Sequence, residues 1–336
     1  MPVIDKERDD QFIRLWRETG GSAAKVAQLL NKTERGVYSR RNELEKRYRI
    51  QLPSAGQTEG KGRGDLPPDF YKYNPRHVVS GFSGRMVVFS DCHWWPGISE
   101  TLAYKALLEV IRELKPKLVI ANGDILDGAK ISRFPPDGWE NRPRMADELE
   151  EVKTRMAEIR HAYRGAEPVR TIGNHDTRFD RWLAVNAGEF EGIAGFRLKD
   201  HLPAWHECIS VFVNDAIVVK HRWHGGAHAA WNNVMKSGLT MVTGHTHALE
   251  ARPYEDYRGR RFGVQTGSLA EVSAAEGQGP QFAYAEDSPG QGRSGFAVLE
   301  VLPGGHLLTP SLCEVVNGAA YFRGQVVVSE RKRRAA

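Results

Sequence analysis

Short segments that combine Asp, His and Asn recur five times between residues 91 and 247. Carboxylate and imidazole groups at such close spacing bind divalent ions, and the order of the segments indicates two ions side by side. Four segments follow apolar runs that predict buried strands, and ligands gather at strand ends in an open α/β sheet. The series therefore predicts metal chemistry at one edge of a sheet. The segments are Asp91-Cys92-His93, Gly123-Asp124-Ile125-Leu126-Asp127, Gly173-Asn174-His175-Asp176, His221 or His224, and Gly244-His245-Thr246-His247.

The donor types narrow the choice of metal. A mixed Asp, His and Asn set without a thiolate favours Mn, Fe, Zn, Ni or Mg over copper(I) or an iron–sulfur cluster. Alternate residues of an extended segment share a face, so Asp91 and His93 should point the same way, as should His245 and His247. Cys92 should then point away and serve as a small core residue.

From Arg85 onward, predicted strands alternate with helical stretches, which is typical of an α/β fold. The helices are expected at 100–114, 145–163, 180–189 and 228–237. After His247 the pattern changes to strands alone, near 260–266, 295–301 and 306–314. The segment Ala274–Gly295 is rich in Gly, Gln, Ser and Pro and is expected to form a loop.

Residues 1–50 predict a separate all-α domain. An apolar helix is followed by two short ones, capped by Ser22 and Thr33, in the manner of a helix-turn-helix. The third helix would offer Arg35, Arg40 and Arg41 to nucleic acid, whereas the simpler interpretation is a three-helix cap packed on an enzyme. Residues 51–83 are expected to be a linker, 84–325 the main domain and 326–336 a basic tail.

Charge and composition limit the partners. Residues 1–64 carry 14 Lys and Arg against 9 Asp and Glu, which accounts for the whole net charge of +5 and favours a polyanionic partner. No run of 18 apolar residues predicts a membrane span, and no signal peptide is indicated. Three scattered cysteines suit a reducing cytoplasm. The sequence does not predict an oligomeric state.

The five segments, in this order, resemble the calcineurin-like metallophosphoesterases over about residues 84–270. The closer pattern, Ser-Asp-Cys-His-Trp-Trp-Pro-Gly with Gly-Asn-His-Asp-Thr-Arg-Phe, is similar to phage- or prophage-encoded members of that family. This resemblance implies the cytoplasm of a bacterium or of a phage-infected host cell. The resemblance implies a β-sandwich flanked by helices for the main domain. It also implies two divalent metal ions, with manganese expected, and a phosphate-ester substrate.

The resemblance also implies a role for each residue. Asp124 would bridge the two metals, and a hydroxide between them would be the nucleophile. His175 would act as general acid beside the leaving oxygen, with Asp127 orienting it. The remaining ligands would be Asp91, His93 and His247 on the first metal and Asn174, His221 and His245 on the second.

Two positions depart from the family pattern. The family usually shows His-Gly after the fourth strand, but here the run is Lys220 to Gly226; His221 directly follows the strand and is favoured, while His224 precedes the glycine and stays an alternative. The protein-phosphatase branch has an arginine after the Asp127 equivalent, whereas this chain has Gly128. Arg178, or Arg133 or Arg181, could contact phosphate instead. Nearby aromatic residues predict either a stacking wall or loop packing: Trp94, Trp95, Phe134 and Trp139.

The leading hypothesis is a two-metal phosphodiesterase, with DNA or RNA as a candidate substrate. The missing arginine lowers the expectation of a phosphoprotein phosphatase, and the basic helical domain favours nucleic acid. The alternatives are a phosphomonoesterase of nucleotides or phosphoproteins, and a nucleic-acid-binding accessory protein with a vestigial metal site. The full set of ligand types argues against the vestigial site.

Overall fold

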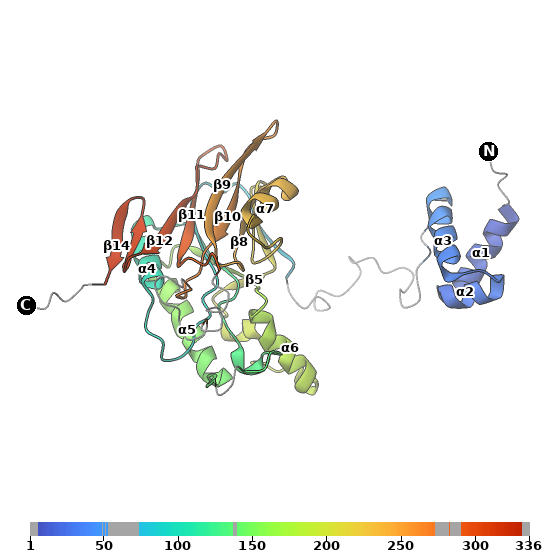
Figure 1. Ribbon diagram of the computed structural model, residues 1–336, viewed down its shortest axis with the longest axis horizontal. Helices are drawn as coiled ribbons and strands as arrows, with labels where there is room; N and C mark the ends of the chain where they lie inside the picture. The colour runs from blue at the N-terminus through green and yellow to red at the C-terminus, as the bar shows by residue number, and fades with distance from the viewer. Residues whose placement is uncertain are drawn as a thin grey trace, which may run out of the picture. The chain divides into compact units, whose positions relative to one another are not determined.

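The computed structural model describes residues 6–48, 50, 52, 74–136, 140–272, 282 and 290–330 (Figure 1). The chain forms two compact units, Met1–Lys72 and Tyr73–Ala336. Most of the predicted linker, six residues of the predicted tail, Trp139 and most of the predicted loop 274–295 lie outside the described residues.

The N-terminal unit consists of three helices, as the sequence predicts: α1 (Lys6–Glu18), α2 (Ala23–Leu30) and α3 (Glu34–Tyr48). The Ser22 side chain accepts a hydrogen bond from the backbone of Lys25 and so caps α2. Asn31 ends that helix in the left-handed conformation, which turns the chain into α3. Apolar side chains from all three helices form the core, among them Phe12, Trp16, Val26, Val37 and Leu44.

A buried carboxylate organises the arginines of α3. Asp9 on α1 is fully buried and pairs with Arg40 and Arg47. Burial alone would raise the pKa of Asp9, but hydrogen bonds from Tyr48 and Arg47 lower it below its usual value. Arg40 is therefore held within the unit by its ion pair with the buried Asp9 carboxylate.

Two of the three predicted nucleic-acid contacts are thus engaged within the unit. Arg40 pairs with Asp9, while Arg41 pairs with Glu45 and lies over the Trp16 ring at 5.3 Å. Arg35 is exposed and forms no ion pair with any residue that the structure describes.

The C-terminal unit is a sandwich of two mixed sheets with helices on the outside (Figure 1). This is the predicted α/β sandwich. One sheet has the order β1 (Arg76–Val79), β6 (Ser210–Val213), β7 (Ile217–Lys220), β8 (Thr240–Thr243), β10 (Gly259–Thr266), β9 (Leu249–Asp256). The other has the order β14 (Gln325–Ser329), β13 (Ala319–Phe322), β12 (Ser311–Val316), β11 (Gly295–Val301), β2 (Gly84–Phe89), β3 (Leu118–Asn122), β4 (Glu167–Thr171), β5 (His206–Cys208).

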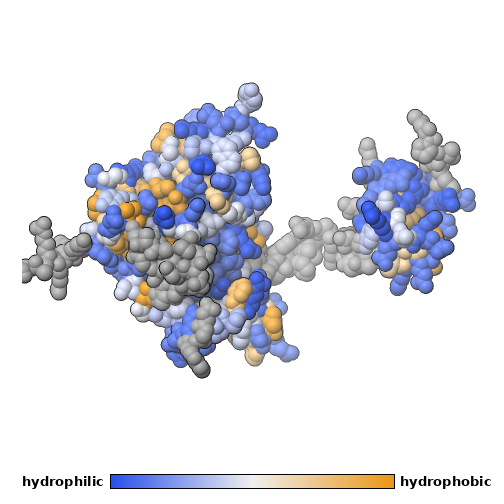
Figure 2. Space-filling model, viewed as in Figure 1, coloured by the Kyte–Doolittle hydropathy of each residue, from blue (hydrophilic) through white to orange (hydrophobic). Residues whose placement is uncertain are grey.

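Alternation along the strands divides the core into two layers. Met86 and Val88 of β2 face the other sheet, whereas Val87 and Phe89 face the helices, because successive side chains of a strand point to opposite faces. Hydrophilic residues cover much of the visible outer surface (Figure 2).

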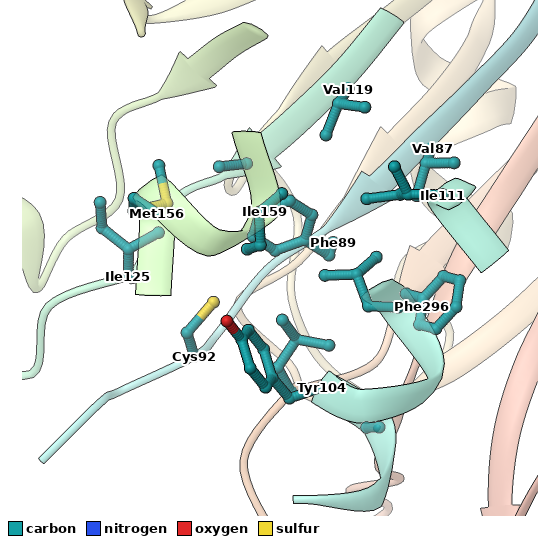
Figure 3. Close-up of a cluster of buried hydrophobic side chains, with 14 of the residues drawn as sticks. Val87, Phe89, Cys92, Tyr104, Ile111, Val119, Ile125, Met156, Ile159 and Phe296 are labelled. Atoms are coloured by element: carbon teal, nitrogen blue, oxygen red, sulfur yellow. The ribbon is translucent and has the colours of Figure 1, made fainter. Parts of the chain in front are cut away.

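Helices α4 (Leu102–Leu114) and α5 (Met145–Ala162) cover the outer face of the second sheet. Figure 3 shows this layer, in which Tyr104 and Ile111 of α4 lie near Phe89 of β2. Cys92 is buried in the same cluster, as predicted for a core residue. Helix α7 (Ala229–Ser237) packs against the first sheet, and α6 (Asp176–Asn186) follows the third metal-binding segment directly.

Several predicted boundaries differ from the structure. Residues 76–79 of the predicted linker form β1, which pairs with β6, and residues 326–329 of the predicted tail belong to β14. Helix α6 begins at Asp176 rather than at residue 180, and the strand predicted at 306–314 begins only at Ser311. Within the described parts of the chain, no helix is both long and apolar enough to cross a membrane.

Candidate metal centre

The sheet topology explains why segments far apart in sequence meet. β2, β3 and β4 are parallel neighbours in one sheet, and β7 and β8 are parallel neighbours in the other. Each of the five segments follows one of these strands. Since carboxyl ends of parallel strands lie at one edge, the two sheets bring the segments together there.

The first group of donors contains Asp91, His93 and His247. One ligand atom from each lies within 4.8 Å of the others. Nε2 of His247 lies 3.3 Å from Oδ1 of Asp91, and Nε2 of His93 lies 4.0 Å from the same oxygen.

The second group contains Asp124, His221 and His245, whose ligand atoms also lie within 4.8 Å of one another. Nε2 of His221 is 3.0 Å from Oδ2 of Asp124. The two groups adjoin, because the backbone N–H of His245 donates to Oδ2 of Asp91 at 2.9 Å.

Glycines allow this close approach. A side chain at Gly173 would place its Cβ 2.1 Å from Oδ1 of Asp124, and one at Gly244 would place it 2.5 Å from Oδ2 of Asp91. No real Cβ tolerates such contacts, so both carboxylates occupy space that only glycine leaves open.

The ligand segments turn rather than extend. Asp91, His93, Asp124, His245 and His247 all have left-handed backbones, with φ between 43° and 69°. The predicted extended conformation is therefore wrong for these segments. Asp91 and His93 still lie in one donor group, as predicted, whereas His245 and His247 lie in different groups. Non-glycine residues held in this region cost about 1 kcal/mol or more each, and such strain is common at functional sites.

Three buried polar atoms show that this site fits metal ions. Nε2 of His93 and Oδ1 of Asn174 are buried without a hydrogen-bond partner among the described residues, and the buried Nε2 of His221 faces Oδ2 of Asp124 at 3.0 Å. Buried polar atoms are almost always satisfied, and each of these is an atom type that coordinates divalent ions. The donor set therefore fits the two metals that the resemblance implies.

The structure also distinguishes the two histidines of the fourth segment. His221 is 1% exposed, and its Nδ1 donates to the backbone carbonyl of Asn122 at 2.8 Å. This hydrogen bond leaves the lone pair of Nε2 free for a ligand. His224 is only half-buried, packs beside Trp223, and lies in neither donor group.

The negative charge of the two buried carboxylates favours a cation at the centre. Burial alone would lower the pKa of His221, but the carboxylates of Asp124 and Asp91 raise it to about 10. His221 thus holds a proton on Nε2, the nitrogen that a metal would bind. The proton and the metal would compete for this nitrogen.

A second network lies beside the donor groups. Nδ1 of His175 is 2.9 Å from Oδ1 of Asp127, and Nδ1 of His93 is 3.1 Å from the same oxygen. Burial alone would raise the pKa of Asp127, but hydrogen bonds from His175 and His93 hold it well below its usual range. Trp95 donates its indole N–H to the other oxygen of Asp127 at 3.1 Å.

His175 is prepared to carry a proton. Burial alone would lower its pKa, but the hydrogen bond to Asp127 and the charge of Asp124 raise it above the usual value. Asp127 thus supports both a predicted ligand and the predicted general acid, which is more than the sequence suggested.

Arg178 completes this network. Its guanidinium donates to the Asp127 carbonyl at 2.8 Å and lies 3.1 Å from Nε2 of His175. Its side chain also covers Gly128, where an added Cβ would meet Arg178 at 3.3 Å. Arg178 therefore occupies the space beside the position at which the protein-phosphatase branch carries its arginine.

Two buried carboxylates, for which the sequence predicts no role, hold the segments in place. Asp176 accepts backbone hydrogen bonds from Asp124 and Gly173, which fixes two segments to each other. Glu148 of α5 accepts from the backbones of Asp127 and Gly128, and burial raises its pKa to about 7. Asp176 stood inside a recognised motif, but nothing in the sequence distinguished Glu148 from other acids of a first helical turn.

The aromatic residues near the segments differ in burial and in their contacts. Trp94 is buried in the core, and Trp95 is half-buried and bonded to Asp127. Phe134 is exposed beneath Arg133. The predicted wall is therefore divided between packing and surface.

Comparison with known proteins agrees with this geometry. Residues 84–249 match the family model described as calcineurin-like phosphoesterase. The chain is 26% identical over 269 residues to the Gene 54 protein of Mycobacterium phage L5, covering 73% of this chain and 98% of that protein. It is 25% identical over 275 residues to the Gene 54 protein of Mycobacterium phage D29, with the same coverage.

Proposed function

We propose, since residues 84–249 form a domain of the calcineurin-like phosphoesterase family, that this protein is a two-metal phosphodiesterase. The family and the two donor groups support the coarser statement, a metal-dependent phosphoesterase. The observation that carries the proposal is a set of buried ligand atoms: Nε2 of His93 and Oδ1 of Asn174, which have no hydrogen-bond partner among the described residues, and Nε2 of His221, which faces Asp124.

The proposed ligands divide between the two ions. Asp124 would lie between the ions, which when bound would activate water and offset phosphate charge. The other ligands would be Asp91, His93 and His247 for one ion and Asn174, His221 and His245 for the other.

His175 would protonate the leaving oxygen. Burial alone would lower the pKa of His175, but its hydrogen bond to Asp127 raises it above the usual value and fixes the ring through Nδ1. A guanidinium N–H of Arg178 faces Nε2 of His175 at 3.1 Å, so Nε2 accepts there and would carry a proton only when Arg178 moves to the substrate. Arg178 would bind a non-bridging phosphate oxygen and release His175 for the transfer.

Gly128 supports a diester over a monoester substrate. A monoester dianion needs more positive charge around its free oxygens, and the arginine that could follow Asp127 is absent. A single guanidinium at Arg178 matches the single negative charge of a diester. Manganese is the proposed metal, and the donor set also accepts Fe, Zn, Ni or Mg.

The N-terminal unit is proposed to contact nucleic acid through α3. Arg35, Tyr38 and Ser39 are exposed on adjoining positions of that helix. The predicted contacts Arg40 and Arg41 would contribute less, because acidic partners already neutralise them.

The test is hydrolysis of a bis-aryl phosphate and an aryl monophosphate by manganese-loaded protein. Diester turnover should exceed monoester turnover and vanish in Asp124→Asn. Asp215→Asn, a change at an exposed turn between β6 and β7, is the matched control and should keep full activity. A strong monoester preference would instead support the phosphomonoesterase alternative. Equal activity of Asp124→Asn and unsubstituted protein would contradict the metal mechanism.

A further inference from the structure

Three arginine–aromatic pairs follow three of the metal-binding segments. The aromatic members are among the exposed large hydrophobic residues of the protein: Phe134 is 58% exposed, Trp182 44% and Trp223 41%. Their arginine neighbours are exposed as well. We call these six residues the arginine–aromatic rim: Arg133, Phe134, Arg181, Trp182, Arg222 and Trp223.

Two of the pairs lie close to the metal centre, one by its distance along the chain and one by hydrogen bonds. Trp223 lies two residues after the buried His221, so their Cα atoms are at most about 7 Å apart. Arg142 donates from one nitrogen to the carbonyls of both Ala129 and Phe134, each at 3.0 Å. The backbone of Phe134 therefore lies next to the segment that begins at Asp127.

The third pair lies on α6. Trp182 is four residues after Arg178, so both lie on one face of the helix, one turn apart. Arg178 itself contacts Asp127 and His175. Trp182 thus extends the surface that begins at the proposed general acid.

The rim arginines have no acidic partners. None of Arg133, Arg181 and Arg222 forms an ion pair with a residue that the structure describes. Their charge is therefore available to an anionic ligand. Two of the rings are already oriented by a neighbour, since Arg133 lies 4.9 Å over Phe134 and the Trp223 ring lies 4.6 Å from that of His224.

This chemistry fits one class of ligand. Flat aromatic faces stack on nucleobases, and guanidinium groups bind the phosphates between them. Bases of a duplex already stack on each other, so exposed rings favour a single strand. Hydrophobic residues are also exposed at the end of α6 and just after it, at Val185, Phe190 and Ile193. That apolar surface lacks the alternating charge of the rim.

We infer that the arginine–aromatic rim binds single-stranded nucleic acid and presents one of its phosphodiesters to the metal centre. This inference rests on the proposed phosphodiesterase function, and it names the substrate class. The rim would hold bases on either side of the scissile phosphate, which would remain between Arg178 and the two donor groups.

The test is binding of a fluorescent single-stranded oligonucleotide to the full chain carrying Asp124→Asn, so that hydrolysis does not intervene. Trp182→Ala and Trp223→Ala should each weaken binding on the order of tenfold, as loss of one base–aromatic stack does. Tyr257→Ala is the matched control, because Tyr257 is fully exposed beside Arg258 on the β9–β10 hairpin. It should not change affinity. Melting temperatures close to that of the parent would exclude unfolding, and Arg181→Ala provides a second, smaller change.

Photocrosslinking of an iodouracil-containing strand separates the rim from the N-terminal unit. Crosslinks at Phe134, Trp182 or Trp223 would support the inference, whereas crosslinks confined to α3 would overturn it. Unchanged affinity in both tryptophan variants, or an equal loss for duplex DNA, would also overturn it. Failure of the proposed function has a different signature, namely no diester hydrolysis by the unsubstituted protein despite rim-dependent binding.

Discussion

Arg178 joins the substrate side of the centre to the proposed general acid. It touches His175, Asp127 and Gly128 at once, although it lies on a helix rather than in the loop after Asp127. An arginine on a helix can therefore reach the region beside Asp127, which the protein-phosphatase branch reaches with an arginine in the loop, when a glycine leaves space for it.

Removal of this guanidinium should lower activity more than stability. Arg178→Ala should reduce kcat/KM for a bis-aryl phosphate roughly 10- to 100-fold, since charge-assisted hydrogen bonds are worth about 1.5–3 kcal/mol. Arg178→Lys should keep only part of the kcat/KM that Arg178→Ala loses. Steady-state kinetics with the exposed Arg112→Ala on α4 as control measures the effect. An unchanged kcat/KM in Arg178→Ala would remove Arg178 from the site.

The fourth segment yields a direct test of ligand identity. His221→Ala should lower the metal content of the purified protein by about one ion per chain, because its buried Nε2 faces the carboxylate of Asp124, the proposed bridging ligand. His224→Ala should keep the full content, since only its backbone is fixed, by Asn233. Elemental analysis measures both. The reverse result would make His224 the ligand.

At the scale of elements, carboxylates bound to backbone N–H groups hold the ligand turns together. Asp176 joins the segment after β3 to the segment after β4 and also begins α6. Glu148 fastens the turn at Asp127 to α5. These contacts explain how left-handed, strained segments keep one geometry.

Loss of the Asp176 charge should loosen two segments together. Asp176→Asn should lower the melting temperature and weaken metal binding, because an amide cannot accept hydrogen bonds equally well with both ends. The expected destabilisation is about 2 kcal/mol. Asp200→Asn is the control, since exposed Asp200 also accepts backbone hydrogen bonds but far from the ligands in sequence. Equal effects of both substitutions would contradict a special role for Asp176.

The same elements show what sequence could and could not predict. The strands before the first, second, fourth and fifth segments were predictable, because buried parallel strands are continuous apolar runs. β1 was missed because it is short and half-exposed, and its partner β6 lies far along the chain. The pairing of Arg40 with Asp9 and the hold of Glu148 on Asp127 were missed for the same reason, since both join distant helix faces and loops.

At the scale of the whole molecule, the candidate metal donors and the excess of basic side chains lie in different units. The metal donors all lie in the C-terminal unit, and eleven basic against seven acidic side chains give residues 6–48 a positive balance. A tethered basic unit would raise the local concentration of a polyanionic substrate at the metal centre.

Deletion of residues 1–72 should therefore weaken binding to nucleic acid without changing turnover of a small aryl diester. The loss should shrink as salt rises, because the interaction is electrostatic. Affinity and kinetics at two salt concentrations measure both effects, with Arg35→Ala as the narrower change. Equal nucleic-acid affinity with and without these residues would make the helices an assembly module instead.

The left-handed backbones of five proposed ligands limit how the thermal stability of this protein could be raised. Each of the five is a carboxylate or imidazole at a position that glycine or asparagine would occupy with less strain. Selection for heat resistance alone would therefore favour replacing them and would lose the enzyme in doing so. Directed evolution of this scaffold has to search for stability elsewhere, in the sheets and in the helical layer of Figure 3.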